Sequence, residues 1–301
     1  MRFVPGVEFI SYDKRGGFAE FRRVRRELRA RRFDLLLHMQ LAFRASLLST
    51  AVRARVKLGF DRARARELQW LFTTDRIRAG GNQHVLDSLF GFTEALGVHD
   101  RSLDFAVPLP AEALLYAARL MPDSRPTLVI SGCSSHRLRN WRPEYYARAA
   151  EHAVRAHGMR VLLCGGPGAV EREMADAIVA EAAVPVLDQV GKDTLPELLA
   201  VLARAHALLT PDSGPAHMAT MVGTPVIGLY APTNPARSGP YLSRAYTVDR
   251  YAEAARRFLG KEPAELPWAT KIEKPGVMDL ITPADVAAKL DGLMRERARR
   301  R

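Results

Sequence analysis

The segment Thr210-Pro-Asp-Ser-Gly-Pro-Ala-His217 decides the fold, because it joins an apolar run at residues 205–209 to a helical stretch at residues 216–222. This arrangement predicts a buried strand that enters a turn, with Pro215 at the first position of a helix. The first backbone N–H groups of such a helix have no partner within the helix, so they favour an anion in front of the turn. We therefore expect an anion site here.

The residues of this turn can either cap the helix or bind a ligand. Asp212 or Ser213 is placed to cap the helix, which is the usual role of such residues. Gly214, in contrast, lets a ligand approach the backbone closely. A second segment rich in glycine and proline, residues 230–241, follows a strand expected at residues 225–229. The two consecutive strands are therefore expected to deliver their loops to the same edge of the sheet.

Length and composition are those of a soluble globular protein with two domains. The 301 residues can bury a large core, and contents of 48% apolar and 26% charged residues are ordinary. No apolar stretch reaches the roughly 18–20 residues of a membrane helix, and the first residues lack the apolar run of a signal peptide. We therefore expect a cytoplasmic protein. Cys133 and Cys164 are too few for a disulfide framework or a four-ligand zinc site and are expected as small buried residues.

The chain is strongly basic, with a net charge of +12, and much of the excess lies in residues 22–32 and 295–301. Such a surface attracts nucleic acid, anionic lipid head groups or a phosphorylated substrate, and charge alone does not choose among them. Phe21, Val24 and Leu28 recur at helical spacing between the arginines. This spacing predicts a helix with one buried stripe and one solvated face.

Strands alternate with helices along the whole chain, which is typical of parallel sheets. In the first half we expect strands at residues 7–10, 33–38 and 56–60 and helices at residues 17–32, 42–54 and 82–96. Residues 98–125 carry several prolines around a short helix at residues 112–120 and are expected to link two domains.

The second half has the clearer pattern. We expect strands at residues 127–131, 159–164, 184–187, 207–209 and 225–229, with helices at residues 143–157, 169–182, 195–205 and 216–222. Five strands with intervening helices predict a doubly wound sheet, whose ligands bind at the carboxyl ends of the strands.

Three loops of this half leave strand ends, at residues 132–141, 165–168 and 212–215. Serine hydroxyls, arginine guanidinium groups and helix-start N–H groups are what a pyrophosphate requires. We therefore expect Ser134, Ser135 and Arg139 to contact phosphate oxygens, and the alternative for Arg139 is a surface salt bridge.

Three further side chains need placing. A carboxylate beside a diphosphate would be repelled by about 1 kcal/mol or more, so Asp212 is expected on ribose or sugar hydroxyls, or as the helix cap. His217 can contact a phosphate when protonated, although a helical histidine between apolar residues is more often structural. Trp141 is expected to pack at a helix start. No Asp-x-Asp occurs, so a nucleotide-sugar enzyme of this sequence would stabilise its diphosphate with helix dipoles and arginine, without a metal.

Five segments in a fixed order carry a family resemblance. They are Ser134-Ser-His-Arg-Leu-Arg-Asn-Trp-Arg-Pro143, Leu162-Leu-Cys-Gly-Gly-Pro167, Asp212-Ser-Gly-Pro-Ala-His217, residues 223–235 and Gly239-Pro-Tyr241. Together they resemble glycosyltransferase family 9, the ADP-heptose:lipopolysaccharide heptosyltransferases. The resemblance covers most of residues 125–245 and is weaker upstream.

The resemblance implies an α/β protein of the GT-B type, with two Rossmann-like, doubly wound domains facing a cleft. Residues 1–122 would form an incomplete N-terminal domain on the acceptor side, and residues 123–301 a C-terminal nucleotide-sugar-binding domain with a C-terminal helix. It implies an inverting transferase, without a cofactor or a metal, that moves heptose from ADP-heptose to a lipopolysaccharide core acceptor.

The resemblance also implies roles for single residues. The family's Asp-Ser/Thr-Gly turn, which holds donor phosphate and sugar, maps onto Asp212, Ser213 and Gly214, followed by Pro215. The basic residue just before the family's tryptophan contacts the phosphates, and Arg139 stands at that place, where lysine is common. Arginine can make the same phosphate contact with a larger, planar set of N–H donors.

The start of the chain departs from the family. Its members begin with a strand and a Gly-Asp loop whose aspartate is the presumed base, and roughly fifty residues of such an opening unit are absent before the pattern resumes. The start is therefore either internal to a longer protein, or the chain is a divergent member. Asp13 and Asp34 are the nearest acidic candidates for the base, and neither matches the motif, so no catalytic residue is assigned.

The leading hypothesis is therefore a heptosyltransferase whose acceptor is a phosphorylated glycolipid at the inner face of the inner membrane, where the basic N-terminal helix gains a role. A non-catalytic nucleotide-sugar-binding protein is the second hypothesis, motivated by the missing loop. A nucleic-acid-binding module is the third; it is disfavoured because interleaved aromatic residues and a zinc or helix-turn-helix signature are missing.

Overall fold

The computed structural model describes residues 6–299, which form two compact units. The first unit comprises the described residues up to Leu103, and the second begins at Asp104. The boundary expected after residue 122 differs from this division, because helix α4 (Ala111–Leu120) packs into the second unit. Its Ala113 and Ala117 share a hydrophobic cluster with Leu202 of helix α7 (Leu195–Arg204).

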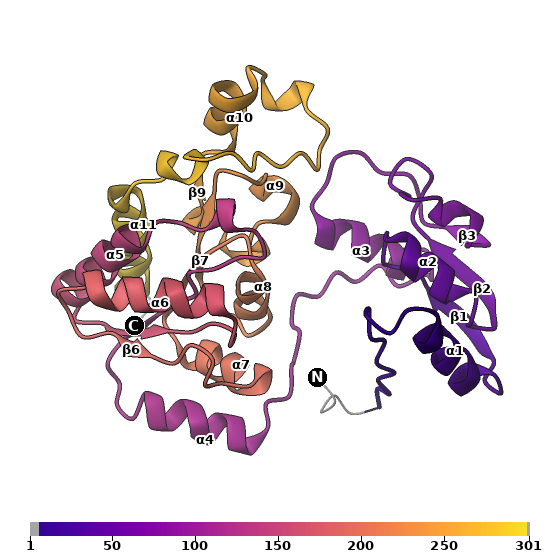
Figure 1. Cartoon of the computed structure of the whole chain (residues 1–301), viewed down its shortest axis with the longest axis horizontal. Coiled ribbons are helices and arrows are strands. Elements are labelled where there is room, and N and C mark those ends of the chain that lie inside the picture. Colours follow the sequence, from indigo (N-terminus) through magenta and orange to yellow (C-terminus); the bar gives the residue numbers. More distant parts are fainter. Residues whose placement is uncertain (1–5, 300–301) are drawn as a thin grey trace. The chain divides into compact units, whose positions relative to one another are not determined.

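The first unit is built on a parallel sheet in the order β1-β2-β3. Its elements are α1 (Gly17–Leu28), β1 (Phe33–Leu37), α2 (Phe43–Ser49), β2 (Ala54–Gly59), the 3-10 helix η1 (Gln69–Leu71), β3 (Asp75–Arg76) and α3 (Val85–Glu94) (Figure 1). A small core of Leu58, Phe60, Ile77 and Phe92 holds the unit together.

Sequence patterns predicted part of this unit. In α1 the stripe is confirmed, since Val24 and Leu28 are buried between exposed arginines. The strand expected at residues 7–10 is wrong: Val7 and Phe9 are exposed and pair with no neighbouring strand, and alternating apolar residues alone do not make a strand. The helix expected at residues 42–54 is shorter, because the chain turns into β2 already at Ala54.

The second unit contains a parallel sheet in the order β6-β5-β4-β7-β8-β9. Besides α4 and α7, its strands and α-helices are β4 (Thr127–Ile130), α5 (Pro143–His157), β5 (Arg160–Leu163), α6 (Ala169–Glu181), β6 (Leu187–Asp188), β7 (Ala207–Pro211), α8 (Gly214–Met221), β8 (Val226–Tyr230), α9 (Pro235–Ser238), β9 (Val248–Asp249), α10 (Tyr251–Leu259) and α11 (Pro283–Arg299). Its 3-10 helices are η2 (Arg137–Arg139), η3 (Tyr241–Tyr246), η4 (Pro263–Glu265) and η5 (Val277–Leu280).

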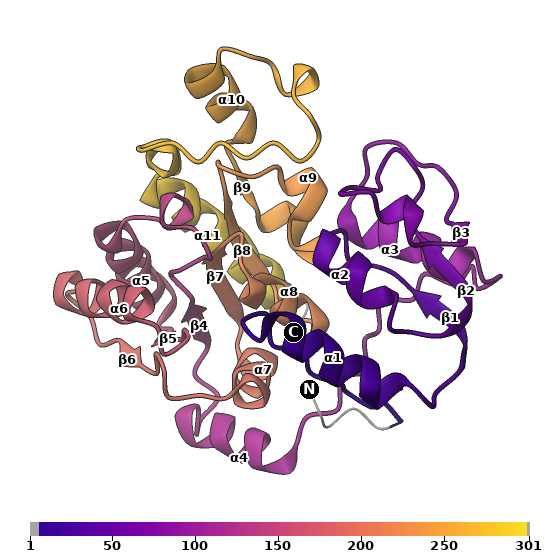
Figure 2. The ribbon, with the colours of Figure 1, turned by 45° about the vertical axis from the view of Figure 1, so that its right-hand side comes forward.

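Alternate residues of the strands pack against helices on opposite faces of this sheet. Ile130 and Leu209 belong to the cluster that also contains residues of α5, α6 and α11, whereas Val129 and Leu208 belong to the cluster with α4, α7 and α8. Figure 2 shows α5 and α6 on one side of β4 and β7 and α8 on the other. The doubly wound sheet expected from the sequence is confirmed, although its sixth strand, β9, is too short to have been predicted.

The strand order identifies where a ligand should bind. From β4 the chain builds outward through β5 and β6 on one side, and then returns to add β7, β8 and β9 on the other. The order therefore reverses between β4 and β7, and crevices at such switch points hold the ligands of open α/β sheets. The loops that leave β4 and β7 are those singled out from the sequence. Within residues 6–299 no helix combines the length and apolar character needed to cross a bilayer.

Candidate functional site

The turn between β7 and α8 presents an uncapped helix start. All five residues of β7 are buried, and α8 begins at Gly214 with Pro215 in its first turn. Ser213 occupies the capping position, but its hydroxyl bonds the Thr210 hydroxyl at 2.8 Å and caps no N–H of the helix. Capping by this side chain, one of the two expected roles, is therefore wrong, because Thr210 takes the hydroxyl. Pro215 has no N–H and the Ala216 N–H donates to the Ser213 carbonyl oxygen at 3.2 Å, so the Gly214 N–H is the one at this helix start that remains available to an anion.

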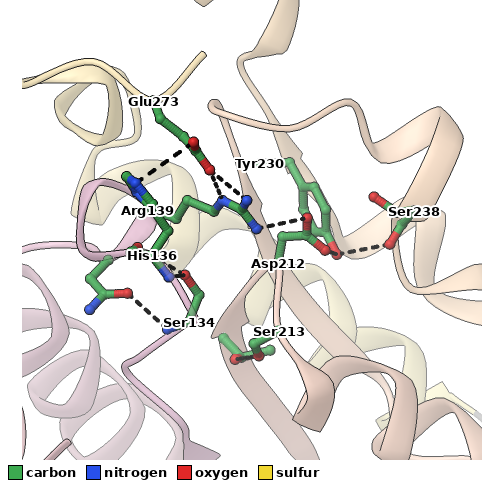
Figure 3. A network of polar contacts seen from close by, with 10 residues as sticks. Ser134, His136, Arg139, Asp212, Ser213, Tyr230, Ser238 and Glu273 are labelled. Carbon is green, nitrogen blue, oxygen red and sulfur yellow. Dashed lines mark hydrogen bonds and ion pairs between the residues drawn. The ribbon is translucent and has the colours of Figure 1, made fainter. Parts of the chain in front are cut away.

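Arg139, on the loop after β4, is a buried cation whose side chain is only 10% exposed. Its Nε and Nη2 donate to the same carboxylate oxygen of Glu273, at 2.8 and 2.5 Å. The third nitrogen, Nη1, lies 4.0 Å from Asp212 Oδ2 (Figure 3). Glu273 therefore fixes the plane of the guanidinium and leaves one nitrogen directed at the turn before α8. The surface salt bridge considered for Arg139 is instead a pair in which the arginine is buried.

Glu273 was not singled out from the sequence, because it lies 134 residues from Arg139 and carries no local motif. Burial raises the pKa of its carboxyl, but the bonds from Arg139 outweigh that effect and bring the pKa below its ordinary value. His136 Nε2 also lies 3.7 Å from this carboxylate. The loop after β4 is thus anchored to the segment that precedes α11.

Asp212 lies between a cation and a phenol. The Tyr230 hydroxyl is 3.5 Å from Asp212 Oδ1, at the outer limit of a hydrogen bond, and 3.3 Å from the Ser238 carbonyl oxygen (Figure 3). Burial, with the neighbouring Asp212 charge, raises the pKa of Tyr230, so the phenol keeps its proton and acts as a donor. Asp212 is thereby directed away from the start of α8, and it does not cap the helix.

The serines of the β4 loop have different surroundings. Ser134 Oγ donates to the His136 carbonyl oxygen at 3.1 Å, and the Ser134 N–H donates to Asn140 Oδ1 at 2.8 Å. These bonds shape the loop itself. Ser135 is exposed. Trp141 packs as expected: it is 1% exposed, and its indole N–H donates to the Ile281 carbonyl oxygen at 2.9 Å.

A pocket of about 360 Å³ adjoins the start of α8. Its walls come from the ends of β4 and β5, from the glycine-rich loop after β5 and from the first residues of α8; they include Gly132, Cys164, Gly166, Gly214 and Pro215. Most of the wall is apolar, as is typical of small-molecule pockets with few polar groups. The loop at residues 165–168, a weak signal in the sequence, therefore lines the same hollow as the start of α8.

Asp193 is one of the polar residues that line this pocket and that were not predicted from the sequence. It precedes α7 in a fourth strand-end loop, and its Oδ2 is buried without a hydrogen-bond partner among the described residues. Burial raises the pKa of this carboxyl to about 6. A buried polar atom without a partner costs free energy, and such atoms often mark binding sites. The sequence did offer one signal for Asp193, its position in the loop between a strand and a helix, β6 and α7.

The remaining expected residues are not among those labelled in the network of Figure 3. His217 is exposed on α8. In the first unit, Asp13 is exposed and accepts the N–H of Arg15 at 2.8 Å, and Asp34 is exposed on β1. Cys133 and Cys164 are both free; Cys164 is buried and Cys133 partly buried, and burial raises the pKa of Cys133 to about 11.

Comparisons with known proteins identify the family of the chain. A sequence model described as Glycosyltransferase family 9 (heptosyltransferase) matches residues 21–274. The chain is 38% identical to the lipopolysaccharide core heptosyltransferase OpsX of Haemophilus influenzae, over 96% of this chain and 83% of that protein. It is 25% identical to lipopolysaccharide heptosyltransferase 1 of Pseudomonas aeruginosa, over 91% and 78% of the two chains.

Solved structures show the same fold. A glycosyltransferase family 9 protein of Veillonella parvula matches with a TM-score of 0.75 at 21% identity, over 98% of this chain and 85% of that one. The heptosyltransferase WaaC of E. coli, solved with ADP, matches with a TM-score of 0.67 at 20% identity, over 92% and 78%. The fold is the GT-B type implied by the resemblance, built from Rossmann-like α/β units with parallel sheets. The chain belongs to glycosyltransferase family 9, the heptosyltransferases.

Proposed function

We propose that this protein transfers heptose from ADP-heptose to a lipopolysaccharide core acceptor with inversion at the anomeric carbon. The observation that carries the proposal is the orientation of the Arg139 guanidinium. Glu273 accepts from two of its nitrogens, and the third faces the Asp212-Ser213-Gly214 turn at an uncapped helix start. A cation and a helix N-terminus that converge on one point suit a diphosphate. The Haemophilus relative is a lipopolysaccharide core heptosyltransferase, which supports the choice of sugar and acceptor.

The donor fits this site in three parts. The pocket of about 360 Å³ beside α8 takes the nucleoside, and its apolar walls suit a base. The diphosphate lies in front of Gly214 and accepts from Arg139 Nη1 and from the Gly214 N–H at the start of α8. Asp212 faces the sugar hydroxyls, which donate to a carboxylate without the repulsion that a phosphate would meet. We place three further residues at the outer edge of the phosphate site: Ser134, Ser135 and His217.

The reaction needs stabilisation of a leaving group. An acceptor hydroxyl oxygen forms a bond to the anomeric carbon, the bond from that carbon to the donor phosphate oxygen breaks, and ADP departs with the electron pair. The acceptor proton passes to a base, and the products are the heptosylated acceptor and ADP. The negative charge that develops on ADP is met by Arg139 and by the dipole of α8, which are in place before the reaction.

The acceptor is proposed to be a phosphorylated glycolipid at the inner face of the inner membrane. Helix α1 supports this assignment, because Val24 and Leu28 are buried while arginines cover the exposed face. Phe18, next to these arginines, is 66% exposed. A face of arginines with one exposed aromatic ring suits an anionic lipid surface.

The test is acceptor-dependent release of ADP. Purified protein is mixed with ADP-heptose and a lipopolysaccharide core that lacks heptose; ADP is measured enzymatically and the acceptor by mass spectrometry. We expect ADP release only with acceptor, together with a mass increase of one heptose. Binding of ADP-heptose without turnover would favour the non-catalytic binding protein. Binding of a short DNA duplex that weakens steeply with salt, with no nucleotide binding, would favour the nucleic-acid module.

A further inference from the structure

A second cluster of titratable side chains lies between α5 and α11, which pack against each other in the second unit. His152 and His157 come from α5, and Asp291 comes from α11. The Nε2 atoms of the two histidines lie 2.6 and 2.7 Å from the same carboxylate oxygen of Asp291. One ligand atom of each residue lies within 4.8 Å of the other two.

This donor set has the chemistry of a transition-metal site. Two imidazole nitrogens and one carboxylate oxygen are ligands of zinc and of neighbouring divalent metals, with bond lengths of about 2.0–2.2 Å. A tetrahedral ion with such bonds holds its ligand atoms a little over 3 Å apart. The present N–O separations of 2.6 and 2.7 Å need to open by roughly 0.6–0.7 Å to reach this spacing, a change within reach of side-chain rotation.

The surroundings allow an ion to enter and to stay. The three side chains are 30%, 17% and 32% exposed for His152, His157 and Asp291, so water reaches the cluster and can supply a fourth ligand.

We propose that His152, His157 and Asp291 bind a divalent transition-metal ion of the zinc class, which ties α11 to α5. The role is structural. His157 stands fourteen residues after the first residue of α5, which at 1.5 Å per residue is about 20 Å along the helix from the end that carries the loop of Arg139. The ion would therefore stabilise the support of the donor loop without touching the donor.

The test uses tag-free full-length protein, treated with chelator and dialysed, and titrated calorimetrically with ZnCl₂ and separately with MgCl₂. We expect one Zn²⁺ per chain with a Kd in the micromolar range or below, and no measurable Mg²⁺ binding at this site, because nitrogen ligands select against magnesium. At a hundredfold excess over Kd, zinc should raise the Tm by about 5 °C or more.

Variants then locate the binding. Asp291→Asn keeps an oxygen that accepts from both histidines but loses the charge, and His152→Gln leaves the bond between His157 and Asp291 in place. Each should weaken Zn²⁺ binding at least tenfold while the metal-free Tm changes by only a few degrees. The control is His99→Ala, an exposed histidine of the first unit, which should bind zinc as the wild type does.

Absence of Zn²⁺ binding by folded wild-type protein would overturn the proposal and leave the cluster as an ion pair between two helices. Binding that both variants retain in full would also overturn it, since the zinc would then be held elsewhere. The readout is independent of transferase activity, so failure of the metal site and failure of the proposed function are separate results.

Discussion

Replacing Arg139 with alanine tests the proposed donor site most directly. In the structure Nε and Nη2 are committed to Glu273, and Nη1, 4.0 Å from Asp212, is the nitrogen left for a phosphate. A hydrogen bond to a charged group contributes about 1.5–3 kcal/mol. Its loss should weaken ADP binding by a factor of about 10 to 150, since 1.4 kcal/mol is tenfold. The measurement is calorimetric titration of ADP into each variant.

The loop that carries Arg139 also offers a matched control, Arg137. Arg137 lies two residues earlier in η2, its side chain is 70% exposed, and it pairs with the exposed Glu173 at 3.3 Å. Arg137→Ala removes the same net charge from the same loop and should change the affinity for ADP by no more than about twofold, because exposed pairs and distant surface charges contribute little. Titration with AMP adds a second comparison: if Arg139 serves the diphosphate, its loss should weaken ADP binding more than AMP binding.

Arg139→Ala also leaves Glu273 without its partner. Breaking a fully buried pair costs about 3–5 kcal/mol, and because 26% of the Glu273 side chain is exposed we expect about 1–2 kcal/mol here. The Tm should fall by several degrees, which leaves the protein folded at the temperature of the titration. ADP binding within twofold of wild type by folded Arg139→Ala protein would refute the reasoning, and so would an equal loss in Arg137→Ala.

Three further predictions concern the pocket and its support. Gly214→Ala should leave the Tm within about 2 °C, because the added Cβ meets no atom within 4 Å, yet weaken ADP binding tenfold or more by occupying the space of the phosphate; unchanged affinity would contradict this. Asp193 has a pKa raised to about 6, so the folded state holds its proton more tightly than the unfolded state and loses stability as pH rises from about 4 to 6. Asp193→Asn should therefore raise the Tm at pH 8 by about 2–4 °C and give no gain at pH 4, and an equal gain at both would contradict the assignment. Trp141→Phe leaves the buried Ile281 carbonyl without its donor and should lower the free energy of unfolding in urea by about 2–4 kcal/mol, so a loss under 1 kcal/mol would show that water replaces the indole.

The regular part of the second unit was predictable because its signals are local. Helix α5 begins at Pro143 and ends at His157 as its sequence indicates, with proline in the first turn and Gly158 in the left-handed conformation after the end. Buried strands such as β7 read as short apolar runs between helices. In contrast, β9 has two residues, too few for any pattern, and it exists only because β8 offers it a pairing edge.

The proposed donor site could be predicted only in part from the sequence, for the same reason. The Asp212 turn and the loop of Arg139 carry local signatures, and a parallel sheet brings both to one edge. The outcome for Ser213 depended on Thr210, whose hydroxyl competes with the helix N–H groups for the same oxygen. Glu273 and Asp193 were missed because each acquires its role from residues distant in sequence: Arg139 for the first, and the walls of the pocket for the second.

The pairing of Arg139 with Glu273 gives a reason for arginine at a place where the family resemblance suggests that lysine is common. A guanidinium carries donors along two edges, so it can give Nε and Nη2 to a carboxylate and still present Nη1 to a phosphate. An ammonium is a single point charge, which Glu273 and a diphosphate would have to share. Arg139→Lys should therefore weaken ADP binding in this chain. Adding Glu273→Gln should restore the affinity for ADP, because the second change frees the ammonium to bind the diphosphate.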